Sequence, residues 1–99
     1  MDVEEAASKA VKNVSGKWTV EIIFELKRHP RTFTEISSNI EDISNKMMSN
    51  TLNELNSKSL VEKPENDKGY KLTEKGVETK KQLKKLGEVT RKYDGNGKI

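Results

Sequence analysis

The sequence predicts a mainly α-helical domain with one small β-wing, and two observations support this fold class. Apolar residues recur at helical spacing through most of the chain. Two short β-type segments, at 60–63 and 70–72, are separated by turn residues. The length of 99 residues fits one domain. We therefore expect a single domain over residues 1–93, followed by a disordered tail over residues 94–99.

The N-terminal third of the chain predicts two helices. A single apolar stripe indicates a first helix over Val3–Val14, which Gly16 ends as a natural C-cap. A second helix is expected to start near Lys17 and to stop at His29, because the proline that follows disfavours helix in the residue before it. The apolar residues of this second helix cover a wide arc. We therefore expect it to be central and the most buried.

The middle of the chain predicts two helices joined by a turn. Thr32 and Glu35 have the spacing of a capping box, and Ser44 is placed to cap the next helix. In that helix one face is apolar and consists of Met48, Leu52 and Leu55. The opposite face is polar and consists of Lys46, Asn50, Asn53 and Ser57, with Ser49 at its margin. After the hairpin, Thr73 is placed to cap a last, long helix that runs to about Tyr93.

This order of elements is that of a winged helix-turn-helix, in which a helix enters the major groove and a hairpin meets the flanking DNA. Amide side chains can pair with base edges, whereas lysine and serine suit phosphates. The residues expected to bind double-stranded DNA are Arg31, Ser44, Asn45, Lys46, Ser49, Asn50, Asn53, Lys63, Lys68 and Lys71. The alternative interpretation is a polar helix face in solvent, beside lysines that keep short edge strands soluble.

The charge distribution supports DNA binding only moderately. The net charge is +3, but residues 44–72 carry five basic and four acidic side chains, a net of +1. Residues 73–99 carry eight basic and four acidic side chains, a net of +4. The densest basic run consists of Lys80, Lys81, Lys84 and Lys85. The run either lies beside DNA or is the solvated face of a long helix, and we favour the solvated face.

Several classes of protein are disfavoured by composition. The chain has no cysteine and one histidine, which argues against disulfides and Cys- or His-rich metal sites. We see no nucleophile–base pair and no glycine-rich phosphate loop, so we expect neither an enzyme nor a cofactor. No apolar run approaches the roughly 20 residues of a membrane span, and the acidic N-terminus has no signal core. We expect a cytoplasmic protein with no membrane partner.

Six segments give the chain a resemblance to a known family. They are Gly16-Lys17-Trp18-Thr19, Phe33-x-Glu35-Ile36, Ile43-Ser44-x-Lys46-x-Met48, Leu52-x-x-Leu55, Leu60-Val61-Glu62 and Tyr70-x-Leu72-Thr73-x-x-Gly76. In order and spacing they resemble HxlR-type regulators, within the MarR-like winged-helix group, over residues 15 to about 86. The resemblance implies dimerisation through the terminal helices and binding to palindromic operators. The chain departs from the family at 50–53, where Asn-Thr-Leu-Asn replaces the usual Gln-Arg-Leu-Arg/Lys, and it lacks the N-terminal cysteine of redox-sensing members.

A homodimer is also expected from the apolar surface of the terminal helices. Hydrophobic residues make up 31% of the chain, so a monomer has a thin core, and an isolated long helix would leave its apolar stripe wet. The expected interface consists of Val3, Ala7, Ala10, Val11, Leu83, Leu86, Val89 and Tyr93. The sequence does not identify a small-molecule effector. The alternative function is a winged-helix protein–protein adaptor, which the near-neutral recognition helix and the acidic turn at Glu41 and Asp42 support.

Overall fold

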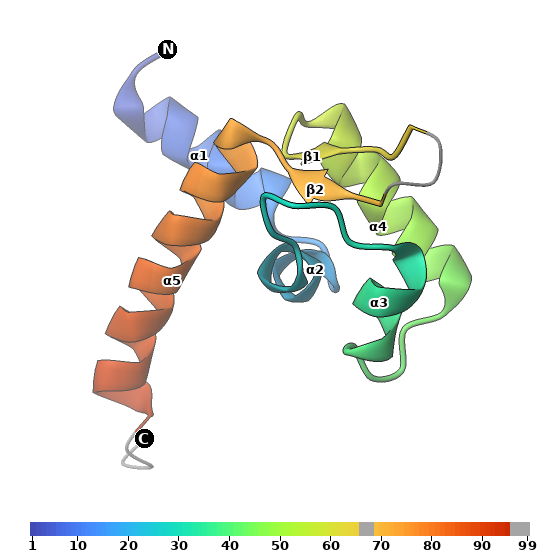
Figure 1. Ribbon diagram of the computed structural model, residues 1–99. Coiled ribbons are helices and arrows are strands. Elements are labelled where there is room, and N and C mark those ends of the chain that lie inside the picture. The colour runs from blue at the N-terminus through green and yellow to red at the C-terminus, as the bar shows by residue number, and fades with distance from the viewer. Residues whose placement is uncertain (66–68, 96–99) are drawn as a thin grey trace.

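The computed structural model describes residues 1–65 and 69–95 and has the predicted fold class, mainly helical with a small antiparallel sheet (Figure 1). The elements follow in the order α1 (Val3–Asn13), α2 (Thr19–Glu25), α3 (Phe33–Ser38), α4 (Asn45–Ser57), β1 (Val61–Glu62), β2 (Lys71–Leu72) and α5 (Glu74–Asp94). Figure 1 shows α3 and α4 at one end of the molecule and α5 at the other. In the predicted tail, Asp94 still belongs to α5, and residues 96–99 lie outside the described part of the chain.

The sheet is smaller than predicted but has a partner that the sequence did not reveal. β1 and β2 pair with Val61 opposite Leu72, and each strand spans only two residues. Arg31 and Tyr70 exchange backbone hydrogen bonds of 2.8 and 2.7 Å, so the segment before α3 extends the sheet. Gly69 has a φ of +97°, and a Cβ there would lie 2.6 Å from the Arg31 carbonyl oxygen. The close pairing of Arg31 and Tyr70 therefore depends on glycine at position 69.

Side-chain caps set the starts of α3, α4 and α5, as predicted. The Thr32 hydroxyl accepts a hydrogen bond from the Glu35 N–H at 3.1 Å, and the Glu35 carboxylate accepts one from the Thr32 N–H at 2.8 Å. This is the predicted capping box. The hydrogen bonds from Thr32 lower the pKa of the Glu35 carboxyl. Ser44 and Thr73 accept the corresponding N–H bonds at the starts of α4 and α5.

The hydrophobic core is built around α2, with α3, α4 and the sheet packed against it. Its fully or nearly fully buried side chains are Ile22, Ile23, Leu26, Ile36, Ile40, Met48, Leu52, Leu55, Leu60, Val61 and Leu72. The prediction for α2 is only partly correct, because Val20 and Phe24 on its outer side remain 39% and 41% exposed. α1 contributes no buried residue.

α2 is also shorter than predicted, beginning at Thr19 and ending at Glu25 rather than running to His29. The reason lies in the sheet. The Lys27 carbonyl accepts a hydrogen bond of 2.8 Å from the Leu72 N–H, so the chain after α2 is extended alongside β2. The proline at position 30 therefore comes too late to decide where the helix ends.

α5 packs on α2 and β2 with its first turns. Gly76 is buried there, and a Cβ at this position would overlap the Leu60 carbonyl oxygen. Lys80 donates to the carbonyl oxygens of Phe24 at 3.2 Å and Leu26 at 2.7 Å, at the end of α2, where carbonyls lack intrahelical partners. The prediction of a solvated basic face is therefore only partly correct for Lys80, which is half-buried. Burial lowers the pKa of Lys80, and the neighbouring Lys84 adds to this effect.

Candidate nucleic-acid interface

α3, the turn at residues 39–44 and α4 form a helix-turn-helix. Ile36 and Ile40 are buried and hold the first helix and the turn against the core, and Phe33 packs at the edge of that core. The turn passes through Asp42, which has a φ of +61°. Among residues with a side chain, aspartate is one of the few that enter this left-handed region without a large cost. The second helix, α4, is thereby held with one face outward.

The outward face of α4 is the polar face that the sequence predicted. Met48, Leu52 and Leu55 are buried, which fixes the rotation of the helix. The exposed side chains include Asn45, Lys46, Ser49, Asn50, Asn53 and Ser57. The amides of this set can each present a donor and an acceptor to one base edge. Their role in DNA reading stays a prediction.

The N-terminus of α4 differs from the starts of the other described helices. α1, α2, α3 and α5 each have a glutamate in the first turn, whereas α4 has no acidic residue there. The positive end of the helix dipole at Asn45 and Lys46 is therefore not offset by a carboxylate on the first turn. The Ser44 hydroxyl accepts from the Met47 N–H at 3.1 Å and can still donate to an anion. This arrangement suits a phosphate group.

The wing contributes cations that acidic neighbours partly compensate. Lys63 is exposed, and Lys71 forms an ion pair of 3.4 Å with Glu62 across the strands. The third predicted wing cation, Lys68, lies outside the described residues. Asn56 donates a hydrogen bond of 2.9 Å to the Val61 carbonyl and so ties α4 to the wing. Sequence reasoning missed this contact, because an amide at the end of a helix gives no sign of its partner.

Arg31 occupies a different environment from the other predicted DNA contacts. Its guanidinium donates to the Glu25 carbonyl at 2.9 Å, lies 3.9 Å from the Glu25 carboxylate, and its side chain is only 17% exposed. This geometry joins the end of α2 to the third segment of the sheet. It disfavours the phosphate contact that the sequence predicts for Arg31.

Comparison with known proteins gives the family. The sequence model of HxlR-like helix-turn-helix proteins matches residues 13–97 of the chain. The chain belongs to this family. It is thus a transcriptional regulator of HxlR and MarR type, a class that acts by binding DNA. No curated protein is similar enough in sequence to match this HxlR-like chain.

Solved structures of regulators share the fold of this HxlR-like protein. A MarR-family regulator from Porphyromonas gingivalis W83 is 30% identical, with a TM-score of 0.72 over 92% of this chain and 91% of that one. The quinone-bound YodB of Bacillus subtilis is 28% identical, with a TM-score of 0.79 over 94% of this chain and 100% of that one. A MarR-family protein from Enterococcus faecalis V583 has a TM-score of 0.85 at 20% identity, over 98% and 93% of the two chains, and supports the fold alone.

The predicted dimer surface of this HxlR-like chain lies on α1 and α5. Val3 and Val11 on α1 are 85% and 65% exposed, and Ala7 and Ala10 are exposed beside them. On α5, Leu86, Val89 and Tyr93 are 63%, 54% and 70% exposed. Leu83 differs, because it is half-buried and packs against the core. These exposed apolar side chains are available to a partner, although their role in dimerisation stays a prediction.

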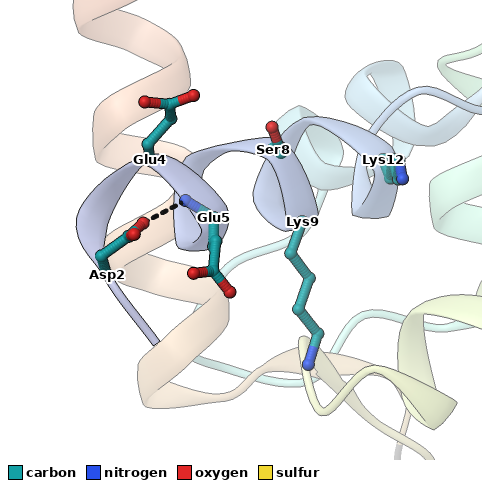
Figure 2. Close-up of a pocket in the computed structure, with 6 residues that line it drawn as sticks. All are labelled: Asp2, Glu4, Glu5, Ser8, Lys9 and Lys12. Atoms are coloured by element: carbon teal, nitrogen blue, oxygen red, sulfur yellow. Dashed lines mark hydrogen bonds between the residues drawn. The ribbon is translucent and has the colours of Figure 1, made fainter.

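A polar hollow of 410 Å³ runs along α1 (Figure 2). Asp2 lies at its end and accepts a hydrogen bond of 2.8 Å from the Glu5 N–H, as the cap of the helix. The other lining residues are Glu4, Ser8, Lys9 and Lys12. Within residues 1–65 and 69–95, no group of three or more His, Cys, Asp or Glu side chains is placed to hold a metal ion. Nor is any helix there both long enough and apolar enough to cross a membrane.

Proposed function

We propose that this HxlR-like chain is a dimeric, sequence-specific regulator that reads a palindromic operator. α4 enters the major groove, and the wing over residues 60–72 meets the backbone or the minor groove. The observation that carries the proposal is the exposed polar face of α4, which continues into a helix start without an acidic residue. A groove with base edges and phosphates complements both features.

The proposal divides the polar and basic residues of α4 and the wing into two roles. Asn50 and Asn53, near the middle of the outward face, read base edges. The residues that contact phosphate are Ser44, Asn45, Lys46 and Ser49 at the start of α4, and Lys63, Lys68 and Lys71 on the wing. Arg31 is left out of both roles because its guanidinium is engaged with Glu25.

Dimerisation supplies the second half of the reading surface. Leu86, Val89 and Tyr93 form an exposed stripe on α5, which a second copy of the chain would cover. Two copies of α4 would then enter successive major grooves, about 34–36 Å apart. Sedimentation of the wild-type protein at micromolar concentration should show a dimer, and a monomer would contradict the proposal. Deleting residues 1–13, none of which is buried, should weaken both dimerisation and operator binding.

The alternative function, a protein–protein adaptor, has a specific observation in its favour. Lys46 is the only cation among the described residues of α4, while Glu54 on the same helix is exposed and the acidic Glu41 and Asp42 precede it. An adaptor of this kind would bind DNA weakly at any sequence. A regulator would instead bind a preferred duplex, with an affinity that falls steeply as salt increases.

In vitro selection from random duplex DNA tests the proposed function. The selected sites should contain two related half-sites in inverted order, separated by about one helical turn. Affinity for the selected duplex, compared with a scrambled duplex over a salt series, separates base reading from phosphate attraction. Recovery of no preferred sequence, together with a shallow salt dependence, would favour the adaptor.

A further inference from the structure

Three consecutive backbone carbonyls join the end of α4 to the start of α5. The Lys58 carbonyl accepts a hydrogen bond of 2.8 Å from the Lys75 ammonium. The Ser59 carbonyl accepts one of 2.6 Å from the Thr73 hydroxyl, and the Leu60 carbonyl accepts one of 3.1 Å from the Thr73 N–H. We call these three hydrogen bonds the α4–α5 junction. Carbonyls at the C-terminal end of a helix lack intrahelical partners, so the junction supplies donors that α4 itself cannot.

The backbone of α4 ends in a conformation that is unusual for its sequence. The Leu60 N–H donates to the Leu55 carbonyl at 2.9 Å, as in a Schellman motif. The Ser59 N–H completes this motif by donating to the Asn56 carbonyl at 3.0 Å. Glycine usually occupies the left-handed position of the motif, but here the residue is Ser59, with a φ of +62°. Since a side chain makes this conformation costly, the surrounding contacts must stabilise it, and the bond from Thr73 is one of them.

The Thr73 hydroxyl has two roles at the junction. It accepts a hydrogen bond of 2.9 Å from the Gly76 N–H, as the cap of α5, and it donates to the Ser59 carbonyl. One hydroxyl can do both, because it has one donor and two acceptor lone pairs. Lys75 adds a positive charge at the negative end of the α4 dipole. The last turn of α4 is thereby fixed to the first turn of α5.

We propose that Thr73 and Lys75 are positioning residues, which fix the direction of α4 relative to α5 and thereby the half-site spacing that the dimer accepts. α4 carries the polar reading face, and α5 carries the exposed stripe that a second copy would cover. A change in the angle between these helices would change the separation of the two reading faces in a dimer. The link to half-site spacing rests on the proposed function, whereas the link between α4 and α5 does not.

Four substitutions separate positioning from capping and from charge. Thr73→Asp keeps an acceptor for the Gly76 N–H, because aspartate is a good N-cap, but its carboxylate cannot donate to the Ser59 carbonyl. Thr73→Ser keeps both roles of the hydroxyl. Lys75→Gln removes the ammonium from the Lys58 carbonyl. Lys85→Gln is its matched control, because Lys85 is an exposed lysine further along α5.

Spin labels test the geometry of the α4–α5 junction without DNA. The chain has no cysteine, so Asn53→Cys and Gln82→Cys place one label on α4 and one on α5, both at exposed positions. Labelled protein diluted with an excess of unlabelled protein reports the distance within one copy. The distance distribution should be narrow without further substitution and with Thr73→Ser or Lys85→Gln. It should broaden or shift with Thr73→Asp and with Lys75→Gln, and an unchanged distribution in both would overturn the proposal.

Spacing selectivity tests the consequence for DNA. The unlabelled variants would be compared on the selected duplex and on duplexes with one base pair inserted or removed between the half-sites. Thr73→Asp and Lys75→Gln should reduce the preference for the selected spacing roughly three- to tenfold, the size expected from losing about one hydrogen bond. Thr73→Ser and Lys85→Gln should retain it.

Two outcomes of the DNA experiment differ in what they contradict. If Thr73→Asp and Lys75→Gln weaken all spacings equally, the two residues do not set half-site spacing and the proposal is wrong. If the unsubstituted protein prefers no duplex, the proposed function fails, and the distance measurement alone decides whether the α4–α5 junction fixes α4.

Discussion

α4 and α5 differ in what each helix leaves exposed. α4 buries Met48, Leu52 and Leu55 completely or nearly so, and its exposed residues are mostly amides, hydroxyls and charged groups. In α5 only Gly76 is buried, and Leu86 and Val89 are more than half exposed. The apolar side of α4 is buried within one copy of the chain, and the polar side that remains exposed suits a polar partner. The apolar side of α5 lacks a cover over its second half, which suits a second copy.

The two helices also differ in charge, in a way that affects how DNA would be recognised. α5 has lysines at 75, 80, 81, 84, 85 and 92, whereas α4 has only Lys46. A recognition helix with one cation gains little from general attraction to phosphate. If α4 reads DNA as proposed, discrimination between sequences would rest on its amides, on DNA shape and on the spacing within a dimer.

The largest expected effect is a difference in stability between substitutions on the buried and the exposed face of α4. Leu52→Ala should lower the free energy of unfolding by about 2–5 kcal/mol, because it leaves a cavity in the hydrophobic core. Asn53→Ala, at the next position, should change stability by less than about 0.5 kcal/mol because the side chain is exposed. Urea denaturation of both variants measures the difference. Similar losses in the two would mean that the assigned rotation of α4 is incorrect.

A second pair of variants contrasts the embedded start of α5 with its exposed second half. Gly76→Ala should destabilise by about 1–3 kcal/mol, since the added Cβ would overlap the Leu60 carbonyl and force the helix to shift. Gly87→Ala is the control, because a Cβ there meets nothing within 4 Å. It should stabilise by about 0.5–1 kcal/mol through helix propensity. If Gly76→Ala stabilised the protein as well, the close approach of α5 to Leu60 would be wrong.

A smaller effect on the pH dependence of stability is expected from the starts of α3 and α4, because only α3 has a carboxylate in its cap. The pKa of Glu35 is lowered in the folded state by its hydrogen bonds with Thr32. Its contribution to stability is therefore present above the unfolded value of 4.5 and is lost as the pH falls through the lower folded value. Glu35→Gln should be less stable than wild type near pH 7, and the difference should shrink on acidification below pH 4.5. Glu54→Gln, on the exposed face of α4, is the control, and an identical pH profile for both variants would contradict the assignment.

The parts of the fold that local sequence determines were predicted well. The caps at Thr32, Ser44 and Thr73 and the apolar face of α4 depend on residues three or four apart, and all are present in the structure. The exposed polar face of α4 follows from the same periodicity. The candidate site could therefore be placed on α4 from the sequence, although which of its side chains touch DNA is a property of the complex.

The features of the fold that the sequence did not predict depend on contacts between residues distant in the chain. The pairing of Arg31 with Tyr70 and of Lys27 with Leu72 decides where α2 ends, and each joins segments about forty residues apart. The contact of Lys80 with the end of α2 spans more than fifty residues. Periodicity identifies Lys80 as one member of a basic run and gives no sign that its ammonium bonds to the end of α2.

The measurement that tests the reading surface of α4 most directly is the affinity of two variants for operator and scrambled duplex across a salt series. Asn50→Ala should lower operator affinity by about 1–3 kcal/mol if the amide pairs bidentately, with little effect on the scrambled duplex. Lys46→Ala should weaken both complexes alike and reduce the salt slope by about one unit. Gln82→Ala and Lys85→Ala, an amide and a cation on the exposed side of α5, are the matched controls and should change neither. If Asn50→Ala weakens both duplexes equally, or neither, α4 does not read bases as proposed.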